Sequence, residues 1–187
     1  MIKRIFDLCL SCFAALLLLI PFLLVWLMVR ITSKGPALYW SDRVGRNNLI
    51  FKMPKFRSMH VDTPAVATHL LDNPQQFLTS IGSFLRKSSL DEIPQLWSVL
   101  KGDMAIVGPR PALFNQHDLI KLRTEKRVHL LKPGITGWAQ VNGRDELPIS
   151  EKIKFDVAYM YKQSFYFDIK ILILTFFKVL GKDGVQH

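Results

Sequence analysis

Residues 8–29 form a continuous run of uncharged and mostly apolar positions. A helix of that length covers roughly 30 Å of hydrocarbon, so the run predicts a membrane-inserted segment. Pro21 lies near its middle, where a proline removes one helical hydrogen bond and clashes with the preceding turn, so we expect a kink there. No small-residue cleavage site follows the run, and we therefore expect the segment to remain in the mature chain.

Basic residues flank this apolar run on both sides, with Lys3 and Arg4 before it and Arg30 and Lys34 after it. A spanning helix would place one basic flank on the disfavoured outer side of the membrane. A re-entrant helix would keep both flanks in the cytosol. A bent transmembrane helix is the alternative, because membrane helices tolerate proline. On the re-entrant interpretation, residues 1–30 form the membrane-inserted part and residues 31–187 a cytosolic domain.

The rest of the pattern predicts a mainly helical α+β fold with a small strand element. Residues 37–59 are short strand-like pieces separated by a turn at 42–48. Helical spacing is found in two short linked helices within 81–100 and in longer segments at 113–131, 150–165 and 168–180. The last segment is too short to span a bilayer, so we expect an amphipathic helix that is buried or lies in the headgroup plane.

The chain is strongly basic. It has 25 Lys and Arg residues and 15 Asp and Glu residues, which gives a formal net charge of +10. Such an excess indicates anionic partners, either nucleic acid, phospholipid headgroups or a phosphorylated substrate. Nucleic-acid binding would benefit from exposed aromatic residues between the basic ones, whereas many aromatics here lie in apolar runs. We therefore expect lipid and phosphorylated partners, and no nucleic acid.

Two neighbouring carboxylates, Asp91 and Glu92, lie within the apolar stretch SSLDEIPQLW at 88–97. Ser89 and Glu92 match a capping box, which would make the acids a helix start signal. Pro94 argues against this, because it removes a hydrogen bond of the first turn. Such a conflict between local rules is enriched at functional sites.

The helical spacing of this stretch places Asp91 and Gln95 on one face, and Ile93 and Trp97 elsewhere. We expect Asp91 to look into a cleft while the apolar residues form a packed wall behind it. A carboxylate can act as a nucleophile toward phosphorus, and a neighbouring Glu92 can serve as base or metal ligand. Two acids beside a diphosphate also call for a divalent cation, and Mg²⁺ prefers such oxygen ligands.

Arg110 lies between two prolines in the stretch GPRP at 108–111, so its backbone is restricted to extended conformations. A rigidly presented guanidinium is a good phosphate clamp, although a solvated Arg on a stiff loop has the same sequence. The glycines of residues 132–144 could direct backbone N–H groups at an anion. Asn142 and Gly143 are also a common hairpin turn, so both interpretations stay open.

Three stretches, KFRSM at 55–59, SSLDEIPQLWSVLKGDMAIVGPRP at 88–111 and KPGITGWAQVNGR at 132–144, resemble the bacterial sugar transferase family. Its small monotopic members are polyprenyl-phosphate phosphoglycosyl transferases, and the resemblance covers essentially the whole chain. It implies transfer of a sugar 1-phosphate from a UDP-sugar to undecaprenyl phosphate, with release of UMP. This reaction is the first membrane step of bacterial glycan assembly, at the cytosolic face of the inner membrane.

The same resemblance implies roles for individual residues. Asp91 would form a covalent phosphosugar intermediate, Glu92 would be the neighbouring acid, and both would hold Mg²⁺. The implied contacts of the substrate phosphates are basic: Lys55, Arg86, Arg110 and Arg144. Asp156 matches an acidic position that recurs in the family, and its role is open. Membrane lipids and downstream glycosyltransferases are further expected partners.

One departure from the family lies at the membrane kink, where Ile20 precedes Pro21 instead of the more usual serine. Two other functions are compatible with the composition. A non-catalytic basic membrane adaptor would explain the charge and the anchor, and a polyprenyl diphosphate phosphatase would use the same acids. Release of UMP that requires a UDP-sugar separates these three functions.

Overall fold

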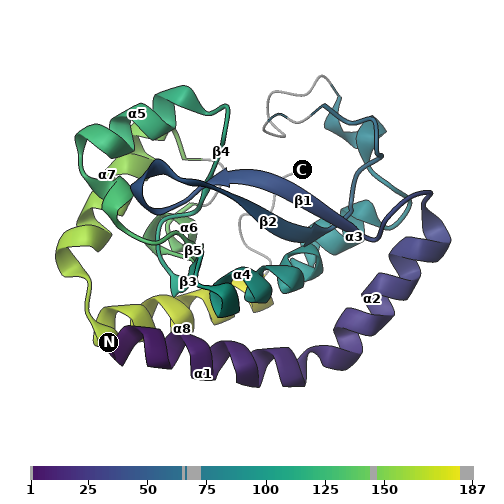
Figure 1. Ribbon diagram of the computed structural model, residues 1–187, viewed down its shortest axis with the longest axis horizontal. Helices are drawn as coiled ribbons and strands as arrows, with labels where there is room; N and C mark the ends of the chain where they lie inside the picture. The colour runs from purple at the N-terminus through teal and green to yellow at the C-terminus, as the bar shows by residue number, and fades with distance from the viewer. Residues whose placement is uncertain (1, 65, 67–72, 144–146, 182–187) are drawn as a thin grey trace.

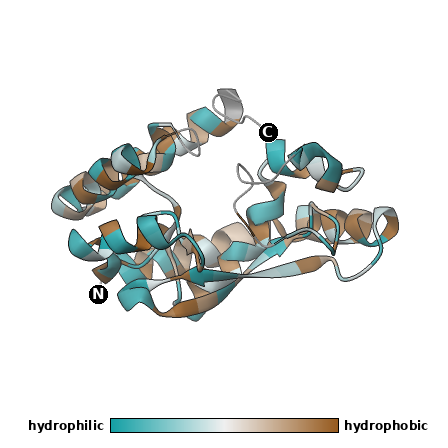
Figure 2. Cartoon of the chain, turned by 90° about the horizontal axis from the view of Figure 1, so that it is seen from above, coloured by the Kyte–Doolittle hydropathy of each residue, from teal (hydrophilic) through white to brown (hydrophobic). Residues whose placement is uncertain are grey.

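A computed structural model describes residues 2–64, 66, 73–143 and 147–181 of the chain. It is mainly helical with two small sheets, which confirms the α+β prediction. Figure 1 shows a long N-terminal helix along one edge, with the strands and the remaining helices stacked above it. Hydrophilic and hydrophobic residues alternate along most helices, as expected of amphipathic elements (Figure 2).

The N-terminal apolar run forms two helices, α1 (Ile2–Leu17) and α2 (Leu19–Thr32), which meet at an angle of 61°. The bend lies at Leu18, one turn before Pro21, because the missing N–H of that proline leaves the carbonyl of Leu17 without its helical donor. None of the described helices is by itself long and apolar enough to span a bilayer, but α1 and α2 reach that length and composition together. The predicted kink is confirmed.

A β-hairpin follows, formed by β1 (Leu38–Val44) and β2 (Ile50–Phe56) in antiparallel register. The turn is shorter than predicted, because Asp42 and Arg43 belong to the strand and face Lys52 and Phe51 across the ladder. Gly45 closes the turn by donating its N–H to the carbonyl of Leu49 at 2.8 Å. The short strand β4 (Ala112–Leu113) pairs with the other edge of β1.

Short helices connect the hairpin to the rest of the chain. They are η1 (Arg46–Asn48) in the hairpin turn, η3 (Pro74–Phe77), α3 (Gly82–Lys87), η4 (Leu90–Gln95) and α4 (Leu96–Lys101). The two linked helices predicted within 81–100 are therefore confirmed. The stretch 88–97 forms η4, a 3-10 helix, and the start of α4.

The predicted helix at 113–131 is shorter in the structure, which has α5 (His117–Glu125) followed by η5 (Val128–Leu130). Leu113 is taken into β4, and Arg127 adopts a left-handed conformation with φ 62°, which ends the helix. The final helices, α7 (Ile149–Lys162) and α8 (Phe165–Gly181), agree with the predicted pair.

A parallel pair of strands, β3 (Ala105–Val107) and β5 (Gly134–Thr136), joins two of the sequence motifs. A side chain at Gly134 would lie 2.1 Å from the backbone nitrogen of Gly108, so glycine is needed for this close approach. The Gly134 N–H donates to the carbonyl of Pro109 at 2.9 Å and is not free to bind an anion. Asn142 ends the short helix α6 (Trp138–Val141), so the alternative hairpin turn is wrong.

Helix α1 contacts the rest of the protein through polar side chains. Arg4 donates to the carbonyls of Val99 and Leu100 at the end of α4, at 2.6 and 2.9 Å. Asp7, which is buried, accepts a hydrogen bond from the Ile106 N–H in β3. The opposite face of α1 exposes Phe13, among other large apolar residues. The fully buried residues of α1 are therefore polar, Asp7 and Ser11, while several of its large apolar residues are exposed.

Candidate active site

The two acids lie at the start of η4, where the local backbone is unusual. Ser89 has a left-handed conformation with φ 56° and makes no side-chain capping bond to the described helix. The capping-box interpretation of Glu92 is therefore wrong, and its side chain is used elsewhere. Pro94 is accommodated because η4 is a 3-10 helix, whose hydrogen-bond pattern differs from that of an α-helix.

Glu92 is bound by two cations from different parts of the chain. Its Oε1 accepts a hydrogen bond from Lys55 Nζ at 2.8 Å and another from Arg110 Nη2 at 3.0 Å. Lys55 comes from β2, and Arg110 comes from the loop between β3 and β4. Burial alone would raise the pKa of Glu92, but these two charges and their hydrogen bonds lower it. Glu92 is therefore ionised and holds both cations beside its neighbour.

Asp91 is 7% exposed and lies 3.9 Å from Lys55 Nζ, measured from its Oδ2. Within the part of the chain that the structure describes, its oxygens accept no hydrogen bond. Burial, together with the Glu92 charge, raises the pKa of Asp91 to about 6, against the lowering effect of Lys55. A carboxylate with unused lone pairs in a positive setting has the properties of a nucleophile toward phosphate.

The other two predicted phosphate contacts are Arg86 and Arg144. Arg86 on α3 lies close enough to lower the pKa of Asp91, and its Nη1 contacts the sulfur of Met59 at 3.6 Å. Arg144 lies outside the described residues. The structure thus brings Lys55, Arg86 and Arg110 to the two acids, from three elements separated in sequence.

Asp156 on α7 has a different environment. Its Oδ2 accepts two hydrogen bonds from Arg123 on α5, from Nε at 2.9 Å and Nη2 at 2.7 Å. The remaining Nη1 of Arg123 donates to the backbone carbonyl of Arg110 at 2.7 Å. Sequence reasoning missed Arg123, because nothing in a charged amphipathic helix distinguishes it from its neighbours.

An apolar groove of about 400 Å³ adjoins the acids. It lies between the α1–α2 bend, the hairpin and the η4–α4 segment, and its lining includes Leu18, Phe22, Trp40, Pro54, Ile93 and Trp97. Pro54 and Ile93, which line the groove, are the chain neighbours of Lys55 and Glu92, so the same strand and the same short helix contribute to the groove and to the polar site. The predicted packed wall is confirmed for Ile93, which packs against buried core residues, but is wrong for Trp97, which is 57% exposed while Gln95 on the Asp91 face is buried.

Comparison with known proteins decides the family. Residues 1–182 match the family described as "Bacterial sugar transferase". The chain belongs to the bacterial sugar transferase family. The predicted resemblance is therefore confirmed over nearly the whole chain.

Relatives of two lengths are similar to this sugar transferase. It is 41% identical to the "Uncharacterized sugar transferase EpsL" of Bacillus subtilis (strain 168), over 100% of this chain and 91% of that protein. It is 40% identical to the "UDP-glucose:undecaprenyl-phosphate glucose-1-phosphate transferase" of Escherichia coli (strain K12), over 95% of this chain and 40% of that protein. The "Galactosyl transferase CpsE" of Streptococcus agalactiae is 42% identical over 81% of this chain and 36% of its own length. The chain thus spans about two fifths of these longer relatives.

The acids of this sugar transferase leave room for a cation. Oε2 of Glu92 and both oxygens of Asp91 accept no hydrogen bond from the described residues. Mg²⁺ is commonly bound through one or two carboxylates together with substrate phosphates, so this donor set fits it. Among the residues that the structure describes, no cluster of three or more His, Cys, Asp or Glu side chains could hold a metal ion. A bound cation would therefore also need ligands from the substrate phosphates.

Proposed function

We propose that this protein transfers a sugar 1-phosphate from a UDP-sugar to polyprenyl phosphate, such as undecaprenyl phosphate, and releases UMP. The observation that carries the proposal is the position of η4 between two unlike environments. Asp91 and Glu92 lie among cations, and the next residue, Ile93, lines an apolar groove. An anionic, water-soluble donor and a lipid acceptor can therefore reach the same carboxylate. Relatives with matching names support this chemistry.

In the first step, a carboxylate oxygen of Asp91 attacks the β-phosphorus of the donor. An oxygen–phosphorus bond forms as the bond from that phosphorus to the bridging oxygen breaks. The bridging oxygen retains the electron pair and departs with UMP. Lys55, Arg86 and Arg110 bind the diphosphate oxygens, since cations placed at developing negative charge stabilise it.

In the second step, an oxygen of polyprenyl phosphate attacks the phosphorus of the covalent intermediate. The bond between this phosphorus and Asp91 breaks, and the free carboxylate is regenerated beside the lipid diphosphosugar. The first isoprene units of the acceptor lie in the apolar groove, which excludes water from one side of the intermediate. Asp91 and Glu92 would hold Mg²⁺ together with the donor, and the ion would neutralise charge on the diphosphate.

We further propose that α1 and α2 form a re-entrant membrane segment, with the catalytic domain at the cytosolic face of the bacterial inner membrane. The support is that two helices bury polar side chains and expose large apolar ones, the reverse of what is usual for a helix that faces water. Helix α1 buries Asp7 and Ser11 and exposes Phe13, and α8 buries Asp168 and exposes Phe176. Such large apolar faces mark a membrane or partner contact.

Purified protein in detergent tests the chemistry directly. With Mg²⁺ and a radiolabelled UDP-sugar but no lipid, we expect label on the protein and about one UMP per active site. Polyprenyl phosphate should then remove the label and form a lipid product. Turnover with lipid, without any label in its absence, would indicate direct transfer. No UMP release from any UDP-sugar would favour the adaptor or the phosphatase.

Cysteine labelling tests the topology. Because Cys9 and Cys12 are exposed, both are first replaced by alanine. A cysteine at the exposed Ile2 should resist a membrane-impermeant thiol reagent added outside intact cells, as should the cytosolic control Tyr161→Cys. Labelling at position 2 but not at position 161 would establish a spanning segment.

A further inference from the structure

The loop that presents Arg110 is held by its backbone carbonyls. Pro109 and Pro111 have no N–H to donate, which leaves the carbonyls as the main attachment points of this loop. Three successive carbonyls each accept a hydrogen bond from a different element. The carbonyl of Pro109 accepts from the Gly134 N–H at 2.9 Å. The carbonyls of Arg110 and Pro111 accept from Arg123 Nη1 at 2.7 Å and from Arg43 Nη1 at 3.1 Å.

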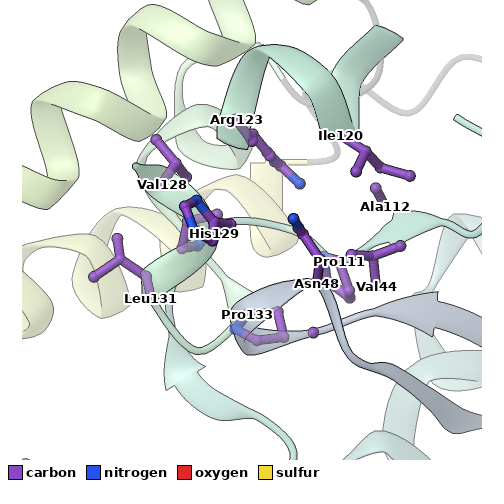
Figure 3. Close-up of a pocket in the computed structure, with 12 residues that line it drawn as sticks. Val44, Asn48, Pro111, Ala112, Ile120, Arg123, Val128, His129, Leu131 and Pro133 are labelled. Carbon is purple, nitrogen blue, oxygen red and sulfur yellow. The ribbon is translucent and has the colours of Figure 1, made fainter. Parts of the chain in front are cut away.

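Behind this loop the packing leaves a small cavity of about 30 Å³, whose lining includes Pro109, Pro111 and Arg123. Figure 3 shows Arg123 extending from the helix above toward the loop, with Pro111 and Ala112 at the opposite side. A cavity of this size holds about one or two waters. Pro109 and Pro111 are themselves buried, and the hydrogen bonds of Arg123 and Arg43 fix the direction of the loop carbonyls.

We propose that Arg123, anchored by Asp156, is a positioning residue that fixes the backbone at Arg110 and so aims the Arg110 guanidinium at Glu92 and the donor diphosphate. The planar fork of Arg123 bonds Asp156 with Nε and Nη2 and the Arg110 carbonyl with Nη1 at the same time. Its side chain is 11% exposed and that of Asp156 is 2% exposed, so this geometry is shielded from water. The diphosphate contact in this inference rests on the proposed function.

The kinetic test uses Arg123→Lys, since lysine keeps the charge but cannot form the planar fork. We expect the rate constant of the UMP burst to fall roughly tenfold to a hundredfold, as for a small misplacement of a catalytic group. The burst amplitude per folded protein should not change. Arg127→Lys, an exposed arginine four residues further along, is the matched control and should behave as the parent protein. A reduced amplitude with an unchanged rate constant would mean a purely structural role and overturn the proposal.

A double-mutant cycle tests whether Arg123 acts through Arg110. In an Arg110→Lys background, Arg123→Lys should have little further effect on the burst rate, because coupled residues are non-additive. A full effect in that background would overturn the proposal. Asp156→Asn should reproduce the Arg123→Lys defect in weaker form, and it serves as the test variant if Arg123→Lys does not fold.

Hydrogen exchange separates this inference from the proposed reaction, because it needs no substrate. Peptides covering residues 108–113 should exchange faster in Arg123→Lys and in Asp156→Asn than in the parent protein or in Arg127→Lys. This result would support the positioning role even if the protein released no UMP. Unchanged exchange in both variants would overturn it.

Discussion

Asp91 and Asp156 are both almost fully buried aspartates, 7% and 1% exposed, but their carboxylates are held in different ways. Asp156 accepts two hydrogen bonds from one arginine. Asp91 has a lysine 3.9 Å away and accepts no hydrogen bond from the described residues. Burial raises the pKa of each, and the adjacent cation lowers it in part.

The difference separates a carboxylate whose hydrogen bonds hold an arginine from one whose oxygens stay available. The two bonds of Asp156 occupy one of its oxygens and fix the orientation of its partner. Asp91 keeps its lone pairs, while Glu92 beside it takes the hydrogen bonds of Lys55 and Arg110. Glu92 thus holds Lys55 and Arg110 near Asp91, while the oxygens of Asp91 itself are not hydrogen-bonded by them. Such an arrangement costs stability and is typical of functional sites.

The largest expected effect is on catalysis by Asp91→Asn. Asparagine keeps the shape but is a poor nucleophile, so we expect the covalent label to vanish and turnover to fall on the order of 10⁴-fold. Asp156→Asn should still accumulate about one label per folded protein, although more slowly. Equal loss of label in both variants would remove the distinction between the two aspartates.

The folded protein should become less stable in Asp156→Asn. This substitution leaves the Arg123 charge with a neutral partner in a buried site, so we expect a loss of about 1.5–3 kcal/mol in unfolding free energy. Denaturant unfolding of the detergent-solubilised protein, followed by far-UV circular dichroism, measures it. Lys154→Gln on the same helix α7, which breaks only the exposed pair with Glu151, is the control and should change little.

Asp91→Asn should stabilise the protein at about pH 7.5, by about 1–3 kcal/mol. The sign follows from the pKa of Asp91, which rises from its ordinary value of 3.8 to about 6 on folding. The folded state therefore favours the protonated form, and the parent protein loses this contribution as pH rises through about 6. The gain of the variant should shrink below that pH and vanish near pH 4. A gain that is independent of pH would contradict the assignment.

The smallest effect is a shift in the pH profile of kcat/KM for the UDP-sugar. Because the nucleophile must be ionised, we expect the acidic limb to have its midpoint near pH 6. Lys55→Gln should move this midpoint upward, since Lys55 is the main charge that lowers the pKa of Asp91. Lys52→Gln, which removes an exposed lysine from the same strand, should leave it in place.

Much of this protein could be read from local sequence. Pro21 predicted the bend because a proline disturbs its own helix wherever that helix lies. The pattern of apolar positions predicted the hairpin and the closing helices, since periodicity is a local property. The motif around Asp91 and Glu92 predicted the family and the pair of acids.

Other features depended on contacts between distant segments. Glu92 was compatible with a helix cap until Lys55 and Arg110 were found on its Oε1. Trp97 was expected to pack inside, but the structure turns the polar face of η4 and α4 inward and leaves Trp97 open. Arg123 could not be singled out at all, because its role arises only when α5, α7 and the Arg110 loop meet. The sequence by itself determined which local elements form and which acids are chemically available. Only the tertiary structure decided which carboxylate is bound by arginine and which keeps its oxygens available, because packing brings together hydrogen-bond partners that are far apart in the chain.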